Sequence, residues 1–233
     1  MKVLSIVLAA LVLVSGSLAY YFHAEAARAK AELKKSQEAQ TDLAYRLADL
    51  ETQKAAIAAE LEAKLADISK QKEEEIARVR ATYEELAADM KEEIEQGQVK
   101  ITQLSDRLSV SMVEKILFPS GEAEISLRGL KVLERVGGVL KNTKGKIIQV
   151  QGHTDNVPIS GSLQKTFPTN WELSAARAIN VVRFLQEKVG IEPERLQAVG
   201  MSEYKPVASN KTPAGRAQNR RIEIVLMPEP AGK

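Results

Sequence analysis

The feature that most restricts the fold is a long stretch without helix breakers. From Ala24 to Leu108 the sequence contains no proline, and Gly97 is its only glycine. Alanine, glutamate, lysine, leucine and glutamine dominate the stretch, and all of these residues favour helix. The sequence therefore predicts one long helix before any globular domain begins.

The apolar residues of this stretch alternate in steps of four and three, which is a heptad pattern. Extra four-residue steps near Ile68 and Leu86 interrupt the pattern as stutters, and it resumes from Gly97 to Leu108. The clearest heptad positions are Leu43, Leu47, Leu50, Lys54, Ile57 and Leu61. We therefore predict a coiled-coil spacer over residues 24–108, formed by a parallel homodimer and about 130 Å long. A single solvated helix with i,i+4 ion pairs is the alternative.

Met1 and Lys2 are followed by an apolar run without charged residues. The run from Val3 to Phe22 is long enough to cross a bilayer, so residues 1–22 are predicted to be a transmembrane anchor. The alternative is a signal peptide cleaved near Ser17-Leu18-Ala19. Both interpretations export the rest of the chain, which places the C-terminal part in the periplasmic side of the cell envelope.

Composition excludes several classes of function. The net charge is +2, which gives no reason to expect nucleic acid as a partner. The chain has no cysteine, so neither a disulfide nor a lipid-bearing thiol is available. Its two histidines, His23 and His153, lie far apart in the sequence, so no metal or other cofactor is expected. No serine stands in a nucleophile-elbow context, so the sequence does not predict an enzyme.

Residues 109–227 have the pattern of an α+β domain, and residues 228–233 are expected to be a flexible tail. Strand and helix signals follow one another in the order β-α-β-α-β-β, with the helices on one face of a small mixed sheet. The expected elements are strands at 108–118, 147–150, 196–199 and 221–226, and helices at 126–142 and 170–189. Asn170 is the expected N-cap of the second helix, and Gly190 its stop.

The second helix is expected to face the end of the preceding strand. Its polar side carries Asn170, Ser174 and Arg177, while Asp155 lies in the turn that follows the strand. An arginine can hold a carboxylate with two hydrogen bonds, and an aspartate can accept from an ammonium group. Together they would suit a ligand that has both groups. The apolar stripe predicted to be buried is Trp171, Ala175, Ala178, Val182, Leu185 and Val189. Trp171 could also stack on a sugar, but its place on this stripe favours the core.

Three motifs in this order resemble the OmpA-like C-terminal domain, the peptidoglycan-binding family of OmpA, MotB and Pal. They are GHTDN, NWELSAARA and KTPAGRAQNRRIEI, preceded by FPSGEAEI. The long loop from Val157 to Thr169 resembles the MotB-type variant. Pro119 stands where many members carry aspartate, so a contact from that position is not expected.

The resemblance implies non-covalent binding of peptidoglycan through the diaminopimelate of its stem peptide. The implied binding residues are Asp155, Arg177, Thr154, Asn170 and an arginine of the pair Arg220 and Arg221. Neighbouring strand residues point in opposite directions, so at most one of that pair can face the ligand.

Two functions remain open from the sequence. The chain is predicted to tether a membrane-anchored envelope protein to the cell wall. Alternatively, it is a structural coiled-coil component of a motor-type or secretion-type assembly, with auxiliary wall binding. The resemblance does not extend to an ion channel, because the apolar run lacks the membrane carboxylate of MotB-type stators.

Overall fold

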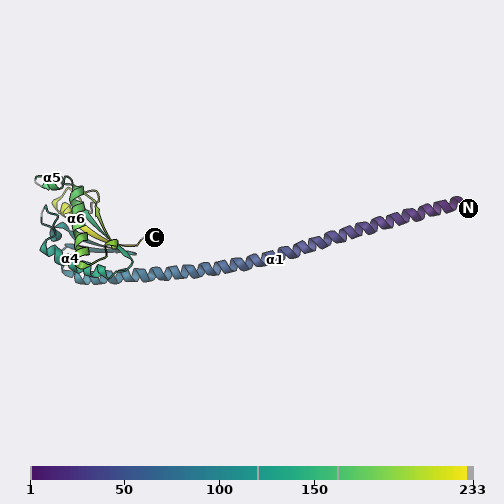
Figure 1. Ribbon diagram of the computed structural model, residues 1–233, viewed down its shortest axis with the longest axis horizontal. Coiled ribbons are helices and arrows are strands. Elements are labelled where there is room, and N and C mark those ends of the chain that lie inside the picture. The colour runs from purple at the N-terminus through teal and green to yellow at the C-terminus, as the bar shows by residue number, and fades with distance from the viewer. Residues whose placement is uncertain (1, 120, 162, 230–233) are drawn as a thin grey trace. The chain divides into compact units, whose positions relative to one another are not determined.

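The computed structural model describes residues 2–119, 121–161 and 163–229, with side chains from Leu11 onward except Val12. The chain divides into an N-terminal unit, residues 1–69, and a C-terminal unit, residues 70–233. Helix α1, Lys2–Asp89, makes up the described part of the N-terminal unit and continues into the C-terminal unit (Figure 1).

In the N-terminal unit, α1 is helical as predicted, and its heptad leucines are exposed. Leu47 is 54% exposed and Leu50 is 59% exposed in the single chain. Exposed i,i+4 ion pairs such as Arg46–Asp42 and Lys64–Glu60 line other parts of the helix. The helix itself is thus shown, whereas its pairing in a coiled coil stays a prediction.

The structure describes the backbone of the predicted membrane anchor from Lys2, but only about half of its side chains. Met1 and the side chains of residues 2–10 and 12 are not described. In the described part of the chain, no helix has both the length and the apolar character that crossing a membrane requires.

The C-terminal unit is built on a five-stranded mixed sheet with the strand order β1-β2-β5-β3-β4. Strands β3 and β4 are parallel, and the other neighbouring pairs are antiparallel. The strands are β1 (Val99–Leu104), β2 (Arg107–Val113), β3 (Lys146–His153), β4 (Leu196–Gly200) and β5 (Arg221–Pro228). The inward residues of this sheet and its helices form the core, so the predicted α+β fold is confirmed.

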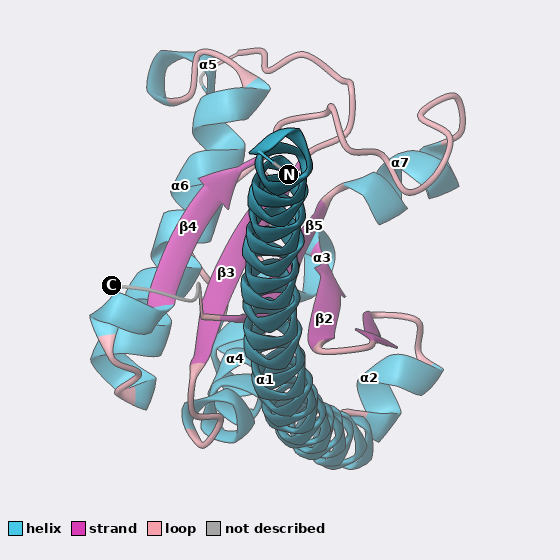
Figure 2. Cartoon of the chain, turned by 90° about the vertical axis from the view of Figure 1, so that its right-hand side faces the viewer, coloured by secondary structure: helices cyan, strands magenta, loops and turns pink. Residues whose placement is uncertain are grey.

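Two main helices pack on the sheet. Helix α4, Leu127–Lys141, begins at the predicted cap, where the Ser126 hydroxyl accepts a hydrogen bond from the Gly129 amide. Helix α6, Asn170–Phe184, packs against β3 and β4 (Figure 2). It continues as the π-turn η1, Leu185–Val189, and ends at the left-handed Gly190, φ 77°. The shorter elements are α2 (Lys91–Glu95), α3 (Glu114–Leu117), α5 (Leu163–Thr166), η2 (Pro193–Arg195) and α7 (Pro213–Asn219).

The expected boundary between spacer and domain at residue 108 differs from the structure. Residues 99–104, assigned to the coiled coil by the heptad pattern, form strand β1 and pair with β2. The helical run ends before this strand, at Gly97, which has φ 66°. Val79, Leu86 and Met90 are buried in the domain core. The four-residue step at Leu86 and Met90, interpreted as a stutter, is therefore part of a helix face that packs on its own domain, whereas Ile68 is 53% exposed.

Two local predictions also need correction. The first predicted strand was expected to run to Phe118, but β2 ends at Val113 and the single-turn helix α3 follows. The alternation of apolar residues continued through that turn and hid it. The N-cap of α6 is Thr169 rather than Asn170, because Thr169 forms a capping box with Glu172.

The buried face of α6 is rotated from the predicted stripe. Trp171, expected in the core, is 48% exposed and stacks on Tyr204. The buried residues are Asn170, Leu173, Ser174, Arg177, Ala178 and Val181. Gly152 allows this face to approach β3 closely, because any Cβ at that position would lie 2.0 Å from the backbone oxygen of Ser174. The side of α6 read as a polar edge thus lies directly against the sheet.

Candidate functional site

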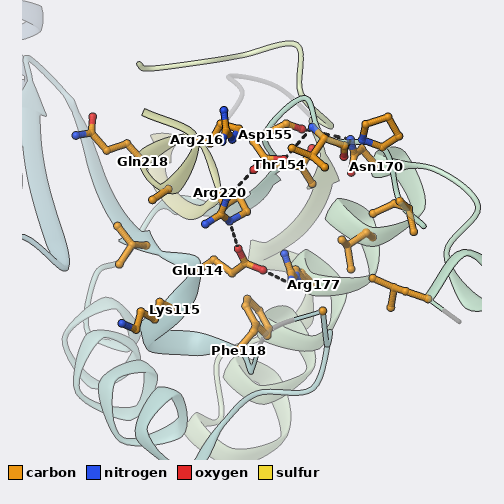
Figure 3. Close-up of a pocket in the computed structure, with 18 of the residues that line it drawn as sticks. Glu114, Lys115, Phe118, Thr154, Asp155, Asn170, Arg177, Arg216, Gln218 and Arg220 are labelled. Atoms are coloured by element: carbon orange, nitrogen blue, oxygen red, sulfur yellow. Dashed lines mark hydrogen bonds and ion pairs between the residues drawn. The ribbon is translucent and has the colours of Figure 1, made fainter. Parts of the chain in front are cut away.

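A cavity of about 770 Å³ lies beside the end of β3, and it gathers most of the predicted site residues. Thr154 and Asp155 enter it directly after β3, while Asn170 and Arg177 reach it from α6 (Figure 3). Arg220, the single residue between α7 and β5, also lines the cavity. Residues widely separated in the sequence therefore converge on a single cavity.

The charges of the cavity form an alternating series. Arg177 pairs through Nη2 with Glu114 Oε1. The other carboxylate oxygen of Glu114 lies 2.6 Å from Arg220 Nε, and Arg220 Nη1 lies 2.5 Å from Asp155 Oδ2. Asp155 and Arg177 thus share the cavity, but each has a different partner (Figure 3).

Arg177 is held firmly at the base of this series. Its side chain is only 3% exposed, and its Nε donates to the backbone oxygen of Glu122 at 2.9 Å. Its guanidinium carbon lies 5.0 Å from the centre of the Phe118 ring, within cation–π distance. Burial lowers the pKa of Arg177, and the neighbouring Glu114 carboxylate opposes this shift.

Arg220 is held differently, because it is more exposed and lies between two carboxylates. Burial alone would lower its pKa, but the hydrogen bond to Asp155 and the charge of Glu114 outweigh this effect and raise the pKa. Its side chain is 37% exposed, compared with 3% for Arg177. The cavity thus contains one buried arginine and one that is partly open to solvent.

The remaining wall supplies fixed polar groups. Asp155 Oδ1 accepts from the backbone amide of Val157 at 3.0 Å, which orients the carboxylate. Asn170 Nδ2 donates to the backbone oxygens of Asp155 and Val157 and to Glu203 Oε2. Thr154 Oγ1 is buried and has no hydrogen-bond partner among the described residues. Buried hydroxyl groups without a hydrogen-bond partner are rare in folded proteins.

The structure separates the two arginines that sequence could not distinguish. Arg220 lines the cavity, whereas Arg221 is turned away from it and is 5% exposed. Arg221 Nη1 donates to the backbone oxygens of Lys205 and Asn219, and its Nη2 pairs with Glu223 at 3.2 Å. Arg221 is therefore held by its own segment and its neighbours, outside the lining of the cavity. The ligand roles of Thr154, Asp155, Asn170, Arg177 and Arg220 stay predictions.

Glu114 and Phe118 are among the cavity residues that sequence reasoning missed, as are Lys115, Arg216 and Gln218. Glu114 lay within the strand expected at 108–118, although it contacts both Arg177 and Arg220. The one available signal was a charged residue within an otherwise apolar alternation. Pro119 is not among the residues that line the cavity.

His153 stands next to the site but does not line the cavity. Its side chain is 2% exposed, and both ring nitrogens lack hydrogen-bond partners among the described residues. Its pKa is lowered to about 4, mainly by burial and also by the Arg221 charge, while the charge of Glu223 partly opposes the shift. It does not pair with Asp155 as a catalytic dyad would require.

We expect His153 to make the domain sensitive to acid. The unfolded chain takes up a proton near pH 6.5, whereas folded His153 does so only near pH 4. Between these values the unfolded state binds more protons, so stability falls as the pH falls. The loss between pH 7 and pH 4.5 should be about 2–3 kcal/mol, measured by urea unfolding at each pH. His153→Leu should lose this part of the pH dependence, and the control His23→Leu should keep it. Equal slopes in the two variants would contradict the assignment.

The C-terminal unit is thus an α+β domain with charged side chains gathered in a cavity beside the end of a strand. The family to which it belongs follows from comparison with known proteins. Residues 117–220 match the OmpA family, and the C-terminal domain of this chain belongs to that family in its MotB-like form.

Among curated proteins, the chain is similar to Motility protein B of Bacillus subtilis. The two are 36% identical over 136 residues, which cover 58% of this chain and 51% of that protein. It is also 35% identical over 111 residues to the peptidoglycan-binding protein ArfA of Mycobacterium tuberculosis, covering 48% of this chain and 32% of ArfA. The chain spans about half the length of the first curated relatives that it matches.

Two solved structures resemble the chain over nearly their whole length. The cell wall anchor of the T6SS from Pseudomonas aeruginosa is 35% identical, with a TM-score of 0.56, and the match covers 62% of this chain and 97% of that one. A putative MotB-like protein from Desulfovibrio vulgaris is 31% identical, with a TM-score of 0.61, covering 68% and 96%.

Proposed function

We propose that the C-terminal unit binds peptidoglycan non-covalently and that the chain anchors an envelope protein to the cell wall. The observation that carries this proposal is the shared cavity of Asp155 and Arg177, opposite charges that are not paired with each other. Family membership supports it, as do the names of the relatives, which include a peptidoglycan-binding protein and a cell wall anchor.

The proposed ligand group is the end of a diaminopimelate side chain, where one carbon carries an ammonium and a carboxylate. In this proposal Arg177 binds the carboxylate, and Asp155 binds the ammonium. The ligand ammonium replaces Arg220 beside Asp155, and the ligand carboxylate shares Arg177 with Glu114. Because the ligand brings one charge of each sign, no buried charge is left without a partner. Thr154 Oγ1 supplies a further hydrogen bond.

The choice of diaminopimelate is tested with cell walls that differ only at the third residue of the stem peptide. Lysine at that position keeps the ammonium but lacks the carboxylate, so Arg177 would gain no partner. The full chain should co-sediment with diaminopimelate-type sacculi and bind lysine-type sacculi at least tenfold more weakly. Equal binding to the two kinds of wall would exclude a diaminopimelate pocket.

We also propose that residues 1–22 anchor the chain in a membrane and that α1 pairs with a second copy in parallel. Cleavage near Ala19 is the alternative for the first segment. The exposed leucines of the heptad support the pairing. Replacing Leu47 and Leu50 by lysine should shift the detergent-solubilised chain from dimer to monomer in analytical ultracentrifugation, because charges on the seam oppose association. A wild-type chain that sediments as a monomer would exclude this dimer.

A role as a structural component of a larger envelope assembly is the second candidate. It is favoured by the similarity to a T6SS cell wall anchor and to Motility protein B. The test is deletion of residues 24–69, which stops before the part of α1 that belongs to the C-terminal unit. If the shortened chain still localises and binds the wall normally, the helix is only a spacer. Loss of its protein partners with wall binding intact would favour the assembly role.

A further inference from the structure

The proposed mechanism leaves one conspicuous pair of side chains unused. Trp171, the only tryptophan of the chain, is 48% exposed, and Tyr204 is 63% exposed. Their rings stack with centroids 5.4 Å apart and planes inclined by 30°. Two large rings that remain largely in water forgo the burial that usually stabilises them. Exposed tryptophan and tyrosine are also the residues most often found at binding hot spots.

Both residues are attached to backbone that the fold holds in place. The Trp171 amide donates to Thr169 Oγ1 within the capping box of α6. Tyr204 follows Ser202, whose amide donates to Ser174 Oγ and whose carbonyl accepts from the Thr154 amide. The pair is therefore presented by the same backbone that shapes the charged cavity. A surface fixed in advance loses little conformational entropy on binding.

Polar groups connect this pair to the cavity. Glu203 precedes Tyr204, and its Oε2 accepts from Asn170 Nδ2 at 3.0 Å. Asn170, which precedes Trp171, lines the cavity. Trp171 thus follows an amide that lines the cavity, and Tyr204 follows the carboxylate that is hydrogen-bonded to that amide.

An aromatic surface beside a hydrogen-bonding carboxylate fits the chemistry of a pyranose ring. Such a ring presents C–H groups on its faces and hydroxyl groups around its edge, so it needs an apolar surface and acceptors together. The negative charge of Glu203 disfavours a phosphate-bearing ligand such as nucleic acid. We propose that Trp171 and Tyr204 form a carbohydrate subsite for an N-acetylhexosamine of the glycan strand, next to the peptide cavity. This proposal rests on the proposed function.

The only tryptophan makes the subsite directly observable. The full chain is titrated with the tetramer of N-acetylglucosamine, which carries no stem peptide, while the fluorescence of Trp171 is followed. We expect a saturable change in emission. Tyr204→Ala should weaken the apparent affinity by about tenfold, because half of the stacking surface is lost. Tyr204→Phe keeps the ring and should retain binding. Tyr45→Ala, which removes a tyrosine that is 74% exposed on α1, should leave binding unchanged.

The outcomes separate this subsite from the proposed cavity. Asp155→Asn should bind the tetramer like the wild type, even if it no longer binds sacculi. Saturable tetramer binding with failed sacculus binding would support the subsite and contradict the proposed function. No change of Trp171 emission with the wild type would overturn the subsite, whatever the sacculi show. Equal tetramer binding by wild type and folded Tyr204→Ala would also overturn it, and the ring pair would then only hold the loop.

Discussion

Replacing Arg177 with methionine should lower the affinity of the chain for diaminopimelate-type sacculi by about 30-fold to several thousandfold. This range corresponds to the about 2–5 kcal/mol lost when one partner of a buried, hydrogen-bonded charge pair is removed. The Arg177 side chain is 3% exposed, and its guanidinium is held by Glu122, Glu114 and Phe118, so it is desolvated and fixed before a ligand binds. Asp155→Asn should cause a loss of similar size, because the ligand ammonium would meet a neutral amide.

A matched arginine on the same helix provides the control. Arg183 also lies on α6, but it is 65% exposed and pairs only with Glu187. Arg183→Met should therefore bind sacculi like the wild type. Co-sedimentation is measured for all variants, with circular dichroism to establish that each is folded. If folded Arg177→Met and Arg183→Met bound equally well, the ligand would have to bind elsewhere.

Replacing Glu114, the ion-pair partner of Arg177, should not lower the affinity for sacculi. In the free chain, Glu114 occupies the guanidinium that the ligand carboxylate needs. Glu114→Gln removes that competing charge, so we expect affinity for sacculi to stay the same or rise by a few-fold. A loss of affinity in Arg177→Met without a loss in Glu114→Gln would show that Arg177 acts on the ligand and does not merely hold Glu114. A loss as large as that of Arg177→Met would instead assign both residues a structural role.

Gly152→Ala should destabilise the C-terminal unit by about 3–5 kcal/mol or prevent its folding. The new Cβ would lie 2.0 Å from the backbone oxygen of Ser174 and 2.8 Å from its carbonyl carbon. Both atoms belong to the backbone, so the strain cannot be relieved by a change of rotamer, and β3 and α6 would have to separate. Urea unfolding of the full chain, followed by circular dichroism, measures the loss.

The control for this substitution is a glycine that contacts nothing. Gly138 is exposed within α4, and a Cβ there would meet no atom within 4 Å. Gly138→Ala should therefore stabilise the domain by about 0.5–1 kcal/mol, because alanine favours helix. Equal stabilities of Gly152→Ala and the wild type would contradict the close approach of the helix to the strand.

The contact at Gly152 also explains the geometry of the cavity. Ser174 and Arg177 lie on the same face of α6, and that face lies against β3. Because the helix can approach so closely, Arg177 lies buried in the wall of the cavity that Asp155 enters from the end of β3. Stability and binding geometry thus depend on the same small residue.

Several features could be predicted from sequence because they depend on neighbours a few residues apart. Ser126 caps α4 and Gly190 ends the helical run as expected. The ordered motifs also identified the fold, and the four residues that they predicted to share a site line one cavity: Thr154, Asp155, Asn170 and Arg177. Errors arose where one local pattern suited two structures. The heptad spacing of α1 equally describes a helix that packs on its own domain through Val79, Leu86 and Met90.

The sequence alone determined the two main helices, four of the five strands and the family, because periodicity, caps and motifs act over short distances along the chain. Only the tertiary structure decided which residues meet. Glu114 contacts Arg177 and Arg220 across separations of 63 and 106 residues, and no local pattern records such a contact. The same holds for the exposed stacking of Trp171 and for the buried position of Arg221 outside the cavity. These depend on how closely α6 lies on β3 and on the direction in which β5 begins, which are set by packing between distant segments.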